Sequence, residues 1–358
     1  MEVVVTSWKG RRVFLTGHTG FKGSWLSLWL ASRGAVIRGY ALDPEPGRSM
    51  FAAASIGEVL EDVRGDIRDL ATLQKAISEF HPEVVFHLAA QPLVRRSYAD
   101  PVGTFATNVM GTAHLLEAVR QTPSVRAVVC VTTDKVYQNG ERERPYTESD
   151  RLGGSDPYSS SKACSELVVA AYRSSYFPVD ELRDQKVSVA TVRAGNVIGG
   201  GDWAQDRLIP DLVRGFEMKR PVLIRRPNAI RPWQHVLDPL GGYIQLAERM
   251  LAQPEGVPES LNFGPRDEDA WPVGAIASKV AGLWGEDASW VRDESEHVRE
   301  HHTLRLDASR ARSVLGWYPR LGIETALEWT VDWYRSWLEG RDMRDETKAQ
   351  IDRFAGLS

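Results

Sequence analysis

Features that would place a protein in a specialised class are missing from this sequence of 358 residues. It has only two cysteines, Cys130 and Cys164, which excludes a disulfide framework and indicates buried thiols in a reducing compartment. No apolar run reaches the ~20 residues that a membrane-spanning helix requires. The first residues, MEVVVTSWKGRR, lack the basic region, apolar stretch and cleavage site of a signal peptide. We therefore expect a cytoplasmic protein.

An excess of charge of one sign is also missing. The chain has 44 Lys and Arg against 48 Asp and Glu, a net charge of −4, so no basic footprint indicates a nucleic-acid partner. Internal repeats and low-complexity segments are absent as well. The chain does have 42% hydrophobic residues and a length that fits one large α/β domain with a lobe. These properties indicate a globular protein and do not identify its function.

Short apolar runs alternate with amphipathic segments over roughly the first half of the chain. We expect strands at residues 11–17, 35–43, 83–90, 126–133 and 187–199, and helices at 24–34, 71–80, 104–121 and 158–176. This alternation predicts an α/β fold, a Rossmann-like doubly wound parallel sheet. From about residue 200 the alternation is lost, until a helix expected at 323–338. We assign residues 1–195 to a Rossmann domain, completed by segments near 230–260, and 196–358 mainly to a smaller C-terminal substrate-binding lobe.

The stretch GHTGFKG places Gly17, Gly20 and Gly23 three residues apart, between an expected strand and an expected helix. Glycines there permit a tight turn, a close approach of the backbone to a pyrophosphate, and a helix N-terminus directed at its charge. The usual dinucleotide fingerprint is GxGxxG, whereas this one is GxxGxxG. We predict that this turn, together with Phe21 and Lys22, binds a dinucleotide.

Asp43 lies 20 residues beyond Gly23, at the end of the second expected strand. A carboxylate there can accept hydrogen bonds from ribose hydroxyls and repels a 2′-phosphate, so we predict NAD rather than NADP. The alternative is that Asp43 is a solvated acid in a turn. Asp66 and Ile67, in RGDIRD, are placed to meet the adenine, although Asp66 is nearly as easily explained as a plain turn residue.

Tyr158 and Lys162 occur as YSSSK on an expected helix, where the four-residue spacing puts both on one face. A tyrosine hydroxyl has a reference pKa near ~10, so it needs a positive neighbour to accept a proton from a sugar alcohol near neutrality. Lys162 and the charge of a nicotinamide could supply it. YxxxK alone is a weak signal, but it gains weight when it follows a dinucleotide-binding turn.

Five motifs resemble, in this order, the extended short-chain dehydrogenase/reductase family that acts on nucleotide sugars: GHTGFKG, HLAA at 87–90, TNVMGT at 107–112, the threonines at 132–133, and YSSSK. The resemblance covers roughly the whole chain. It implies a Rossmann domain that holds NAD and a C-terminal lobe that holds the nucleotide sugar. It also implies that Tyr158 is the catalytic base and Lys162 its partner and a ribose contact, with Thr132 or Thr133 near the sugar. Further cofactor contacts implied by the resemblance are Leu88, Ala89, Ala90 and Asn108.

The strand end CVTTDKVY, residues 130–137, helps to distinguish the reactions that this family catalyses. A 4-epimerase needs only transient oxidation at C4, whereas a 4,6-dehydratase also needs groups that remove the C5 proton and protonate the departing C6 hydroxyl. Asp134 and Lys135, directly after Thr133, supply two such groups. dTDP-glucose dehydratases typically carry Thr-Asp-Glu here. The departure from that pattern, with AAQPLVRRSY at 89–98 and GNVIGGGDWAQDRLIPD at 195–211, resembles the 4,6-dehydratases that act on CDP-glucose.

Two roles are open for the lysine of this strand end. We expect Lys135 to be the base at C5 and Asp134 the acid at C6. A base needs the neutral amine, which desolvation or a positive neighbour would favour. The opposite possibility is that a charged Lys135 stabilises the developing enolate. A third alternative is that Asp134 and Lys135 form a solvated pair without a catalytic role.

A nucleotide diphosphate is best met by arginine forks and helix N-termini. By the same resemblance, Asn196, Arg207 and Arg231 lie nearest the diphosphate. Further substrate-binding candidates are Gln91, Arg96, Ser97 and His235, the last of which could equally line a pocket or the core. The His-rich stretch HVREHH at 297–302 is interpreted as a solvated segment, and no metal is expected.

The sequence therefore predicts an NAD-dependent sugar-nucleotide 4,6-dehydratase, with CDP-glucose as the favoured substrate and CDP-4-keto-6-deoxyglucose as the product. The alternatives are a nucleotide-sugar 4-epimerase and a regulator that binds NAD without chemistry. Intact Tyr158 and Lys162 argue against the regulator. The resemblance also suggests that the helices at 104–121 and 158–176 pair in a homodimer or homotetramer.

Overall fold

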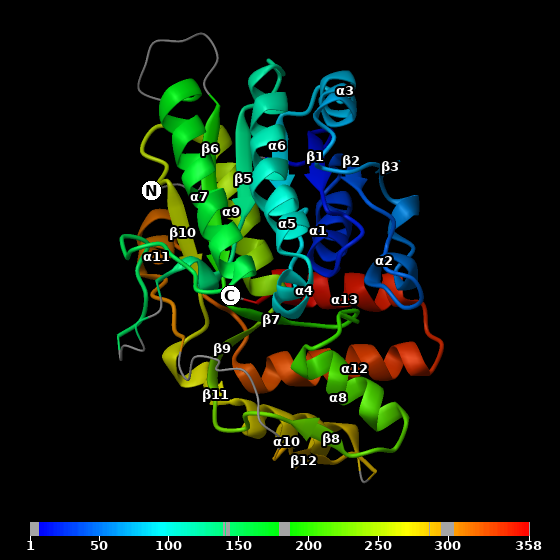
Figure 1. Cartoon of the computed structure of the whole chain (residues 1–358). Helices are drawn as coiled ribbons and strands as arrows, with labels where there is room; N and C mark the ends of the chain where they lie inside the picture. Colours follow the sequence, from blue (N-terminus) through cyan, green and yellow to red (C-terminus); the bar gives the residue numbers. More distant parts are fainter. Residues whose placement is uncertain are drawn as a thin grey trace.

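The chain folds into a large sheet covered by helices on both faces, with a smaller layer of helices and short strands beneath it (Figure 1). The computed structural model describes residues 7–138, 140, 144–178, 187–285, 287–294 and 304–357. The elements are β1 (Arg12–Thr16), α1 (Phe21–Ser32), β2 (Val36–Ala41), α2 (Met50–Ala53), η1 (Ile56–Glu58), β3 (Glu61–Arg64), α3 (Leu70–Phe80), β4 (Val84–His87), α4 (Val94–Ala99), α5 (Pro101–Phe105), η2 (Ala106–Met110), α6 (Gly111–Arg120), β5 (Ala127–Val131), η3 (Asp134–Val136), α7 (Pro157–Tyr176), β6 (Ser188–Ala194), β7 (Asn196–Ile198), α8 (Leu208–Glu217), β8 (Val222–Ile224), β9 (Ile230–His235), α9 (Leu237–Ala252), β10 (Ser260–Phe263), η4 (Asp267–Asp269), β11 (Ala270–Pro272), α10 (Val273–Trp284), β12 (Trp290–Arg292), α11 (Ser309–Leu315), α12 (Ile323–Leu338) and α13 (Met343–Ala355).

The large sheet has seven strands in the order β10-β6-β5-β4-β1-β2-β3, and every neighbouring pair is parallel. Parallel strands buried on both faces are expected to be apolar throughout, as β5 is and as β4 is up to its last residue, His87. One face packs on α1 and α9, and the other on α3, α6 and α7. This confirms the predicted doubly wound, Rossmann-like sheet. The strand order reverses between β1 and β4, which is where such sheets bind ligands.

One expected strand is in fact two strands in different sheets. The segment predicted as a single strand over 187–199 breaks at Gly195: β6 stays in the large sheet, while β7 pairs with β9 in a three-stranded sheet, β11-β9-β7. A glycine is needed at this break, because a Cβ on residue 195 would lie 2.6 Å from Cγ of Pro232 in β9. The break carries the chain from the upper layer to the lower one.

The helix expected at 104–121 is also interrupted. Five residues, Ala106–Met110, form a π-helical turn between α5 and α6, a feature that is frequent at functional sites. It directs the side chain of Asn108 to the loop after β4 and to α7, through hydrogen bonds with Gln91 and Ser161. Of the two cysteines expected to be buried, Cys130 is, but Cys164 is only half-buried.

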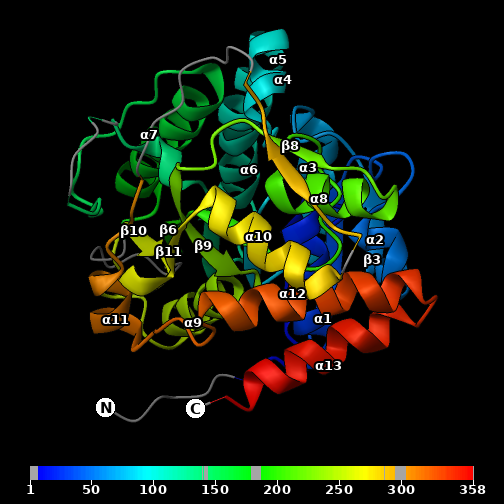
Figure 2. The same ribbon diagram turned by 90° about the horizontal axis from the view of Figure 1, so that it is seen from below.

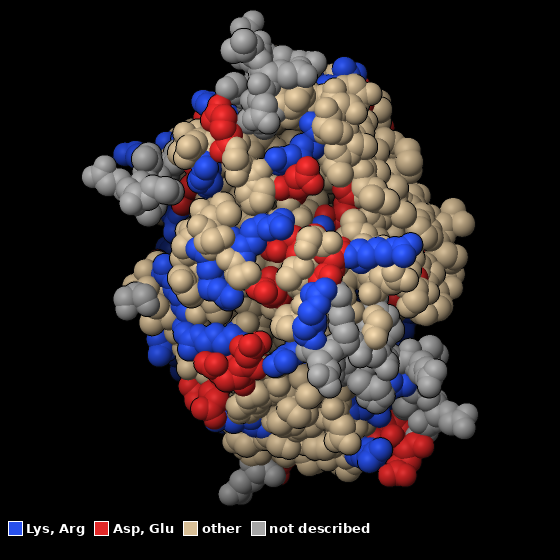
Figure 3. Space-filling model, turned by 90° about the vertical axis from the view of Figure 1, so that its left-hand side faces the viewer, with Lys and Arg blue, Asp and Glu red and all other residues tan. Residues whose placement is uncertain are grey.

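The lower layer contains α8, α10, α12 and the two-stranded sheet β8–β12 (Figure 2). The last helix, α13, returns to pack on α1, where Phe354 meets Trp29 edge to face. None of the described helices is long and apolar enough to cross a membrane. On the face turned to the viewer in Figure 3, basic and acidic side chains are interspersed. The carboxyl ends of β1, β4 and β5 face the lower layer (Figure 1), so side chains that follow these strands lie between the two layers.

Candidate active site

The glycine turn after β1 leaves no room for side chains at two of its three glycines. Gly17 has φ +79°, and a Cβ there would lie 2.7 Å from the backbone nitrogen of Ala89 in the loop after β4. At Gly23 a Cβ would overlap the carbonyl of Gly17. Gly20 begins α1 without a side-chain cap, so the first N–H groups of the helix remain available to an anion. This bare helix start at the reversal point of the sheet fits the diphosphate of a dinucleotide.

Two acids lie at the end of this site that is expected to take the adenosine. Asp43 is 87% exposed just beyond β2, and its Oδ1 lies 3.6 Å from Nε of Arg64. Asp66 instead accepts hydrogen bonds from Arg68, which lowers the pKa of Asp66. Ile67 is buried against Gly111 in the core under α6. Ribose contact by Asp43 stays a prediction, whereas Asp66 and Ile67 already have structural roles.

Tyr158 and Lys162 lie on the first turns of α7. The helix is capped by Asp156, which accepts the N–H of Ser159 at 2.9 Å. Burial raises the pKa of Tyr158 to about 12, against the opposing effects of a hydrogen bond with Thr133 and the charge of Arg207. Lys162 donates to the carbonyl of Val131 at the end of β5 at 2.9 Å, and burial lowers its pKa to about 8. The effect of the Arg207 charge on Tyr158 was not expected from the sequence.

The polar residues after β5 divide into buried and exposed members. Thr133 donates to Oδ1 of Asp134 at 3.0 Å and caps the short helix η3. Asp134 is 4% exposed, and burial raises its pKa although the charges of Lys135, Arg231 and Lys22 oppose this. A raised pKa favours the protonated carboxyl, which is the form that a general acid requires. Lys135 is exposed and therefore in contact with water.

Lys22 extends from the first turn of α1 toward the same group of residues. Burial lowers the pKa of Lys22 to about 8, the charges of Arg207 and Lys162 act in the same direction, and Asp134 opposes them. Its ammonium group therefore lies within electrostatic range of both the acid Asp134 and the partner of the tyrosine. The glycine turn and the end of β5 thus contribute to one site.

A buried ion pair that the sequence analysis did not single out holds this site together. Arg193 of β6 forms a two-pronged pair with Glu166 of α7, with Nε–Oε1 at 2.9 Å and Nη2–Oε2 at 2.8 Å. Thr132 and Thr191 donate their hydroxyls to the same carboxylate. Thr132 therefore donates its hydroxyl inside the protein, and its expected contact with a ligand stays a prediction.

The same arginine extends the network to the edge strand β10. Its Nη1 donates to the hydroxyl of Tyr137 at 2.8 Å, which in turn donates to Asn262 at 2.7 Å. Two signals could have identified the pair in the sequence. Glu166 lies four residues after Lys162 on the same helix face, and Arg193 is the one charged residue in the strand segment SVATVRA.

The loop after β4 and α4 uses most of its predicted ligand-binding groups internally. The amide of Gln91 bonds to Leu93 and Thr104. Ser97 has no exposed surface, and its hydroxyl accepts the N–H of Tyr158 at 3.1 Å. These two residues, like Asn108, stabilise the shape of the site by internal hydrogen bonds, and their expected contacts with ligands stay predictions. Leu88, Ala89 and Ala90 are half-buried beside the glycine turn, where a cofactor contact stays a prediction.

The predicted substrate-binding residues differ in where the structure places them. Arg207 pairs with Asp202 at 2.9 Å and Arg231 acts on Asp134, so both guanidinium groups are at the site. Asn196 is half-buried in β7. The expected substrate contact of His235 is corrected: its ring is fully buried between Trp25 and Trp329, burial lowers its pKa to about 3, and it lines the core. Arg96 lies on the surface, 3.6 Å from Glu45. The stretch at 297–302 lies outside the described residues.

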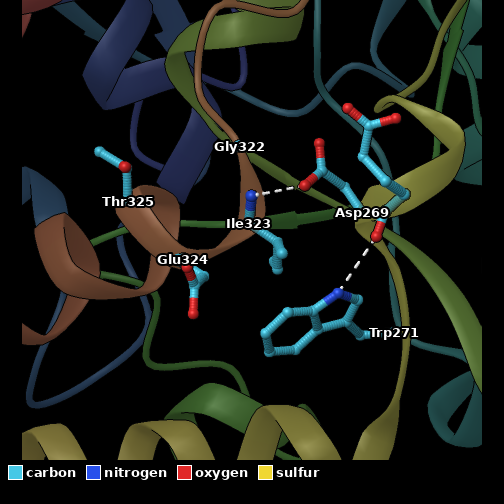
Figure 4. Close-up of a pocket in the computed structure, with 7 residues that line it drawn as sticks. Asp269, Trp271, Gly322, Ile323, Glu324 and Thr325 are labelled. Atoms are coloured by element: carbon cyan, nitrogen blue, oxygen red, sulfur yellow. Dashed lines mark hydrogen bonds between the residues drawn. The ribbon is translucent and has the colours of Figure 1, made fainter.

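A pocket of about 330 Å³ lies apart from these groups, where α12 begins (Figure 4). Asp269 accepts the N–H of Ile323 there at 2.8 Å, so its carboxylate serves as a helix cap. None of the predicted site residues lines this pocket, whose walls are Glu268, Asp269, Trp271, Gly322, Ile323, Glu324 and Thr325. We therefore give it no part in the chemistry.

Comparison with known proteins agrees with this geometry. Residues 13–264 match the NAD dependent epimerase/dehydratase family. The chain is 52% identical over 347 residues to the CDP-glucose 4,6-dehydratase of Salmonella typhimurium, covering 97% of each protein. It is 28% identical to the UDP-glucose 4-epimerase of Mycolicibacterium smegmatis, over 91% of this chain and 99% of that protein. The solved structure of MoeE5 in complex with UDP-glucose and NAD has a TM-score of 0.76 at 27% identity, covering 91% of this chain and 99% of that one.

The substitution Glu166→Gln should destabilise the protein strongly. It leaves the Arg193 guanidinium buried without a counter-charge, and breaking a buried pair from one side typically costs about 3–5 kcal/mol. Chemical denaturation followed by circular dichroism would measure the loss. The double variant Glu166→Gln/Arg193→Met should recover part of it, because no unpaired charge then remains.

Glu339→Gln is the matched control, since Glu339 pairs with Arg341 at 2.8 Å on the surface with both side chains 57% exposed. Exposed pairs contribute about 0–1 kcal/mol. Equal losses for the two Glu→Gln variants would show that the buried pair is not a main support of the site.

Proposed function

The chain belongs to the NAD dependent epimerase/dehydratase family, and on that premise we propose that it removes water from CDP-glucose and forms CDP-4-keto-6-deoxyglucose. The observation that carries this proposal is 52% identity to a CDP-glucose 4,6-dehydratase across 97% of both chains. The site supports it, because a buried acid that favours its protonated form, Asp134, lies beside Lys135 at the strand end next to Tyr158. An epimerase needs no such acid.

The chemistry divides between the cofactor and the protein. Bound NAD supplies a reversible acceptor for the hydride that leaves C4 and returns to C6, so no external oxidant is consumed. Tyr158 takes the proton of the C4 hydroxyl, helped by the positive charges of Arg207 and the nicotinamide. The glycine turn and the start of α1 hold the NAD diphosphate, and Lys22 lies where it can contact both the cofactor and Asp134.

The elimination of water needs one proton removed and one supplied. Asp134 donates its proton to the departing C6 hydroxyl, for which burial prepares it by favouring the protonated form. We assign the removal of the C5 proton to Lys135. This side chain is exposed in the ligand-free structure, and a bound sugar would cover it and withdraw water from the amine.

The two layers divide the binding. We propose that the seven-stranded layer binds NAD, with β10 and α9 completing it, and that the lower layer holds the nucleotide sugar. Arg207 and Arg231 stand at the boundary, where two negative charges of a diphosphate would meet two guanidinium groups. A nucleotide sugar bound there would reach from the lobe to Tyr158.

The proposed activity predicts one dehydrated product. Incubated with CDP-, dTDP-, UDP- and GDP-linked hexoses, the protein should convert CDP-glucose to a compound 18 mass units lighter, a loss of one water. The product should absorb ultraviolet light in alkali, as expected of a 4-keto-6-deoxy sugar. Tyr158→Phe should reduce the rate by about 10²–10⁴-fold, the usual contribution of a positioned acid or base.

An isomer of unchanged mass would instead identify a 4-epimerase. NAD binding with no change in any of the sugars would favour a regulator without chemistry. Product formation at an unchanged rate by Tyr158→Phe would move the active site elsewhere.

Isotope exchange in D₂O can distinguish Lys135 acting as the base at C5 from Lys135 acting only through its positive charge. In Asp134→Asn, oxidation at C4 continues while loss of water is slowed, so deuterium should accumulate at C5 of recovered CDP-glucose. Adding Lys135→Met should lower this exchange by about 10²-fold or more if the amine is the base. Mass spectrometry of recovered substrate measures it.

Lys135→Arg is the matched control, because arginine keeps the positive charge and cannot act as a base in a protein. Exchange lost in both the Met and Arg variants supports the base. Exchange retained with Arg and lost with Met assigns Lys135 to stabilising the enolate by its charge. Exchange at the native rate in both removes Lys135 from this step.

We also propose that the chain pairs through α5, η2, α6 and α7. Large apolar side chains are exposed on these neighbouring elements, with Val102 78%, Leu167 60% and Met110 51% exposed. An apolar surface of this kind typically marks a protein interface. Leu167→Lys should shift the sedimentation of the protein to that of a monomer, whereas Leu338→Lys on α12, a leucine exposed to 49%, should not. A native protein that sediments as a monomer would contradict the proposal.

A further inference from the structure

The segment GGGD at 199–202, which joins β7 to the lobe, is held on several sides. A Cβ on Gly200 would overlap the ring of Trp333 in α12, and a Cβ on Gly199 would lie 2.9 Å from Cγ1 of Val236. Gly201 has φ +81°, and a Cβ there would overlap Met50 of α2. Three successive glycines are thus required by close packing, so the turn has little freedom to move.

Asp202 follows these glycines and uses both carboxylate oxygens. It is 5% exposed. Oδ2 pairs with Nη1 of Arg207 at 2.9 Å, and Oδ1 accepts the N–H of Ala204 at 3.1 Å. Its carbonyl accepts the hydroxyl of Tyr334 in α12 at 2.5 Å. Backbone and side chain are therefore both fixed, and the carboxylate holds the arginine in one direction.

Arg207 lies within electrostatic range of Tyr158 and of Lys22 of α1. Its own strongest electrostatic partner is Asp202, whose carboxylate raises the pKa of the guanidinium. Arg207 is the residue before α8 and has about a third of its side chain exposed. Arg207 can therefore contact a ligand through its exposed part while it stays paired with Asp202.

The turn is also bonded to the elements expected to hold NAD. Nε1 of Trp25 in α1 donates to the carbonyl of Gly200 at 2.9 Å. Arg48, in the loop that follows β2, stacks its guanidinium over Trp203 at 5.2 Å and over Trp337 at 4.6 Å from the ring centroids. The helix that receives the diphosphate and the loop that carries Asp43 thus both contact the segment around Asp202.

We propose that Asp202 is a positioning residue for the dehydration: anchored on the glycine turn, it holds the Arg207 guanidinium where its charge acts on Tyr158 and so couples the NAD-binding layer to activation of the base. This inference rests on the proposed function of the site. Arg207 then has two roles, since it binds the diphosphate and also favours the tyrosinate electrostatically. The acid that directs it does not touch the substrate.

The test is the pH dependence of kcat/KM for CDP-glucose with the NAD-loaded protein. Catalysis needs deprotonated Tyr158, and moving the arginine away raises the pKa of this hydroxyl, so the acidic limb of the profile should move to higher pH in Asp202→Asn. The rate at neutral pH should fall by about 10²-fold, the size of effect expected when a positioned group is misplaced by about 1 Å. Arg207→Met should move the limb in the same direction.

A double-mutant cycle separates positioning from a general structural effect. In the Arg207→Met background, adding Asp202→Asn should not move the limb further, because the residue acts only through the arginine. Asp206→Asn is the matched control: Asp206 lies on the same segment and pairs with Arg95 at 3.0 Å and with Arg225 at 3.6 Å. It should leave the profile unchanged. Additive shifts, or a loss of thermal stability in Asp202→Asn with an unmoved limb, would overturn the proposal.

A crystal structure of Asp202→Asn with NAD provides a readout that does not depend on activity. The Arg207 side chain should leave its native position, whereas it should stay in place in Asp206→Asn. If the native protein forms no product from CDP-glucose, the proposed function fails, and the structure still decides whether Asp202 holds the arginine. An unmoved Arg207 in the Asp202→Asn structure would contradict the inference even if the activity were confirmed.

Discussion

The buried pair between Glu166 and Arg193 is the constraint on which the active site depends. Both side chains are 4% exposed, so their desolvation must be offset by a two-pronged pair and by hydroxyl donors on each carboxylate oxygen. The pair fixes α7 against β5 and β6 at a single height. Because Tyr158 and Lys162 are on the same helix, their positions relative to the end of β5 follow from it. The directional hydrogen bonds of this pair set the position of α7 more closely than apolar contacts would, because apolar contacts have no preferred direction.

Burial is also what gives the site its chemistry. The same dry environment favours the neutral forms of Asp134 and Tyr158 and lowers the pKa values of Lys22 and Lys162 to about 8. Without a ligand the tyrosine is therefore a poor base. A positively charged nicotinamide, together with Arg207, would supply the field that it lacks. The base would then be activated only when the cofactor is in place.

Glycines decide how the two layers meet. Gly195 ends the strand of the upper sheet beneath Pro232, and the turn at 199–201 passes through a gap that any side chain would close. These close approaches bring Arg207 and Arg231 to the end of β5 and the start of α7. The seven-stranded layer and the lower layer therefore share one closely packed boundary, with Asp202 and Arg207 on it.

The sequence by itself determined the periodic and local features. Alternating apolar runs predicted the parallel sheet, the spacing of Gly17, Gly20 and Gly23 predicted the bare helix start, and YSSSK put a tyrosine and a lysine on one helix face. Only the tertiary structure decided the rest, because those features depend on contacts between distant segments. Residue order could not reveal that Ser97 and Gln91 are used internally, that His235 is enclosed by two tryptophans, or that Lys135 is exposed beside a buried Asp134. Nor could it pair Glu166 with Arg193, or direct Arg207 toward Tyr158, since burial and charge proximity arise only when the strands and helices pack.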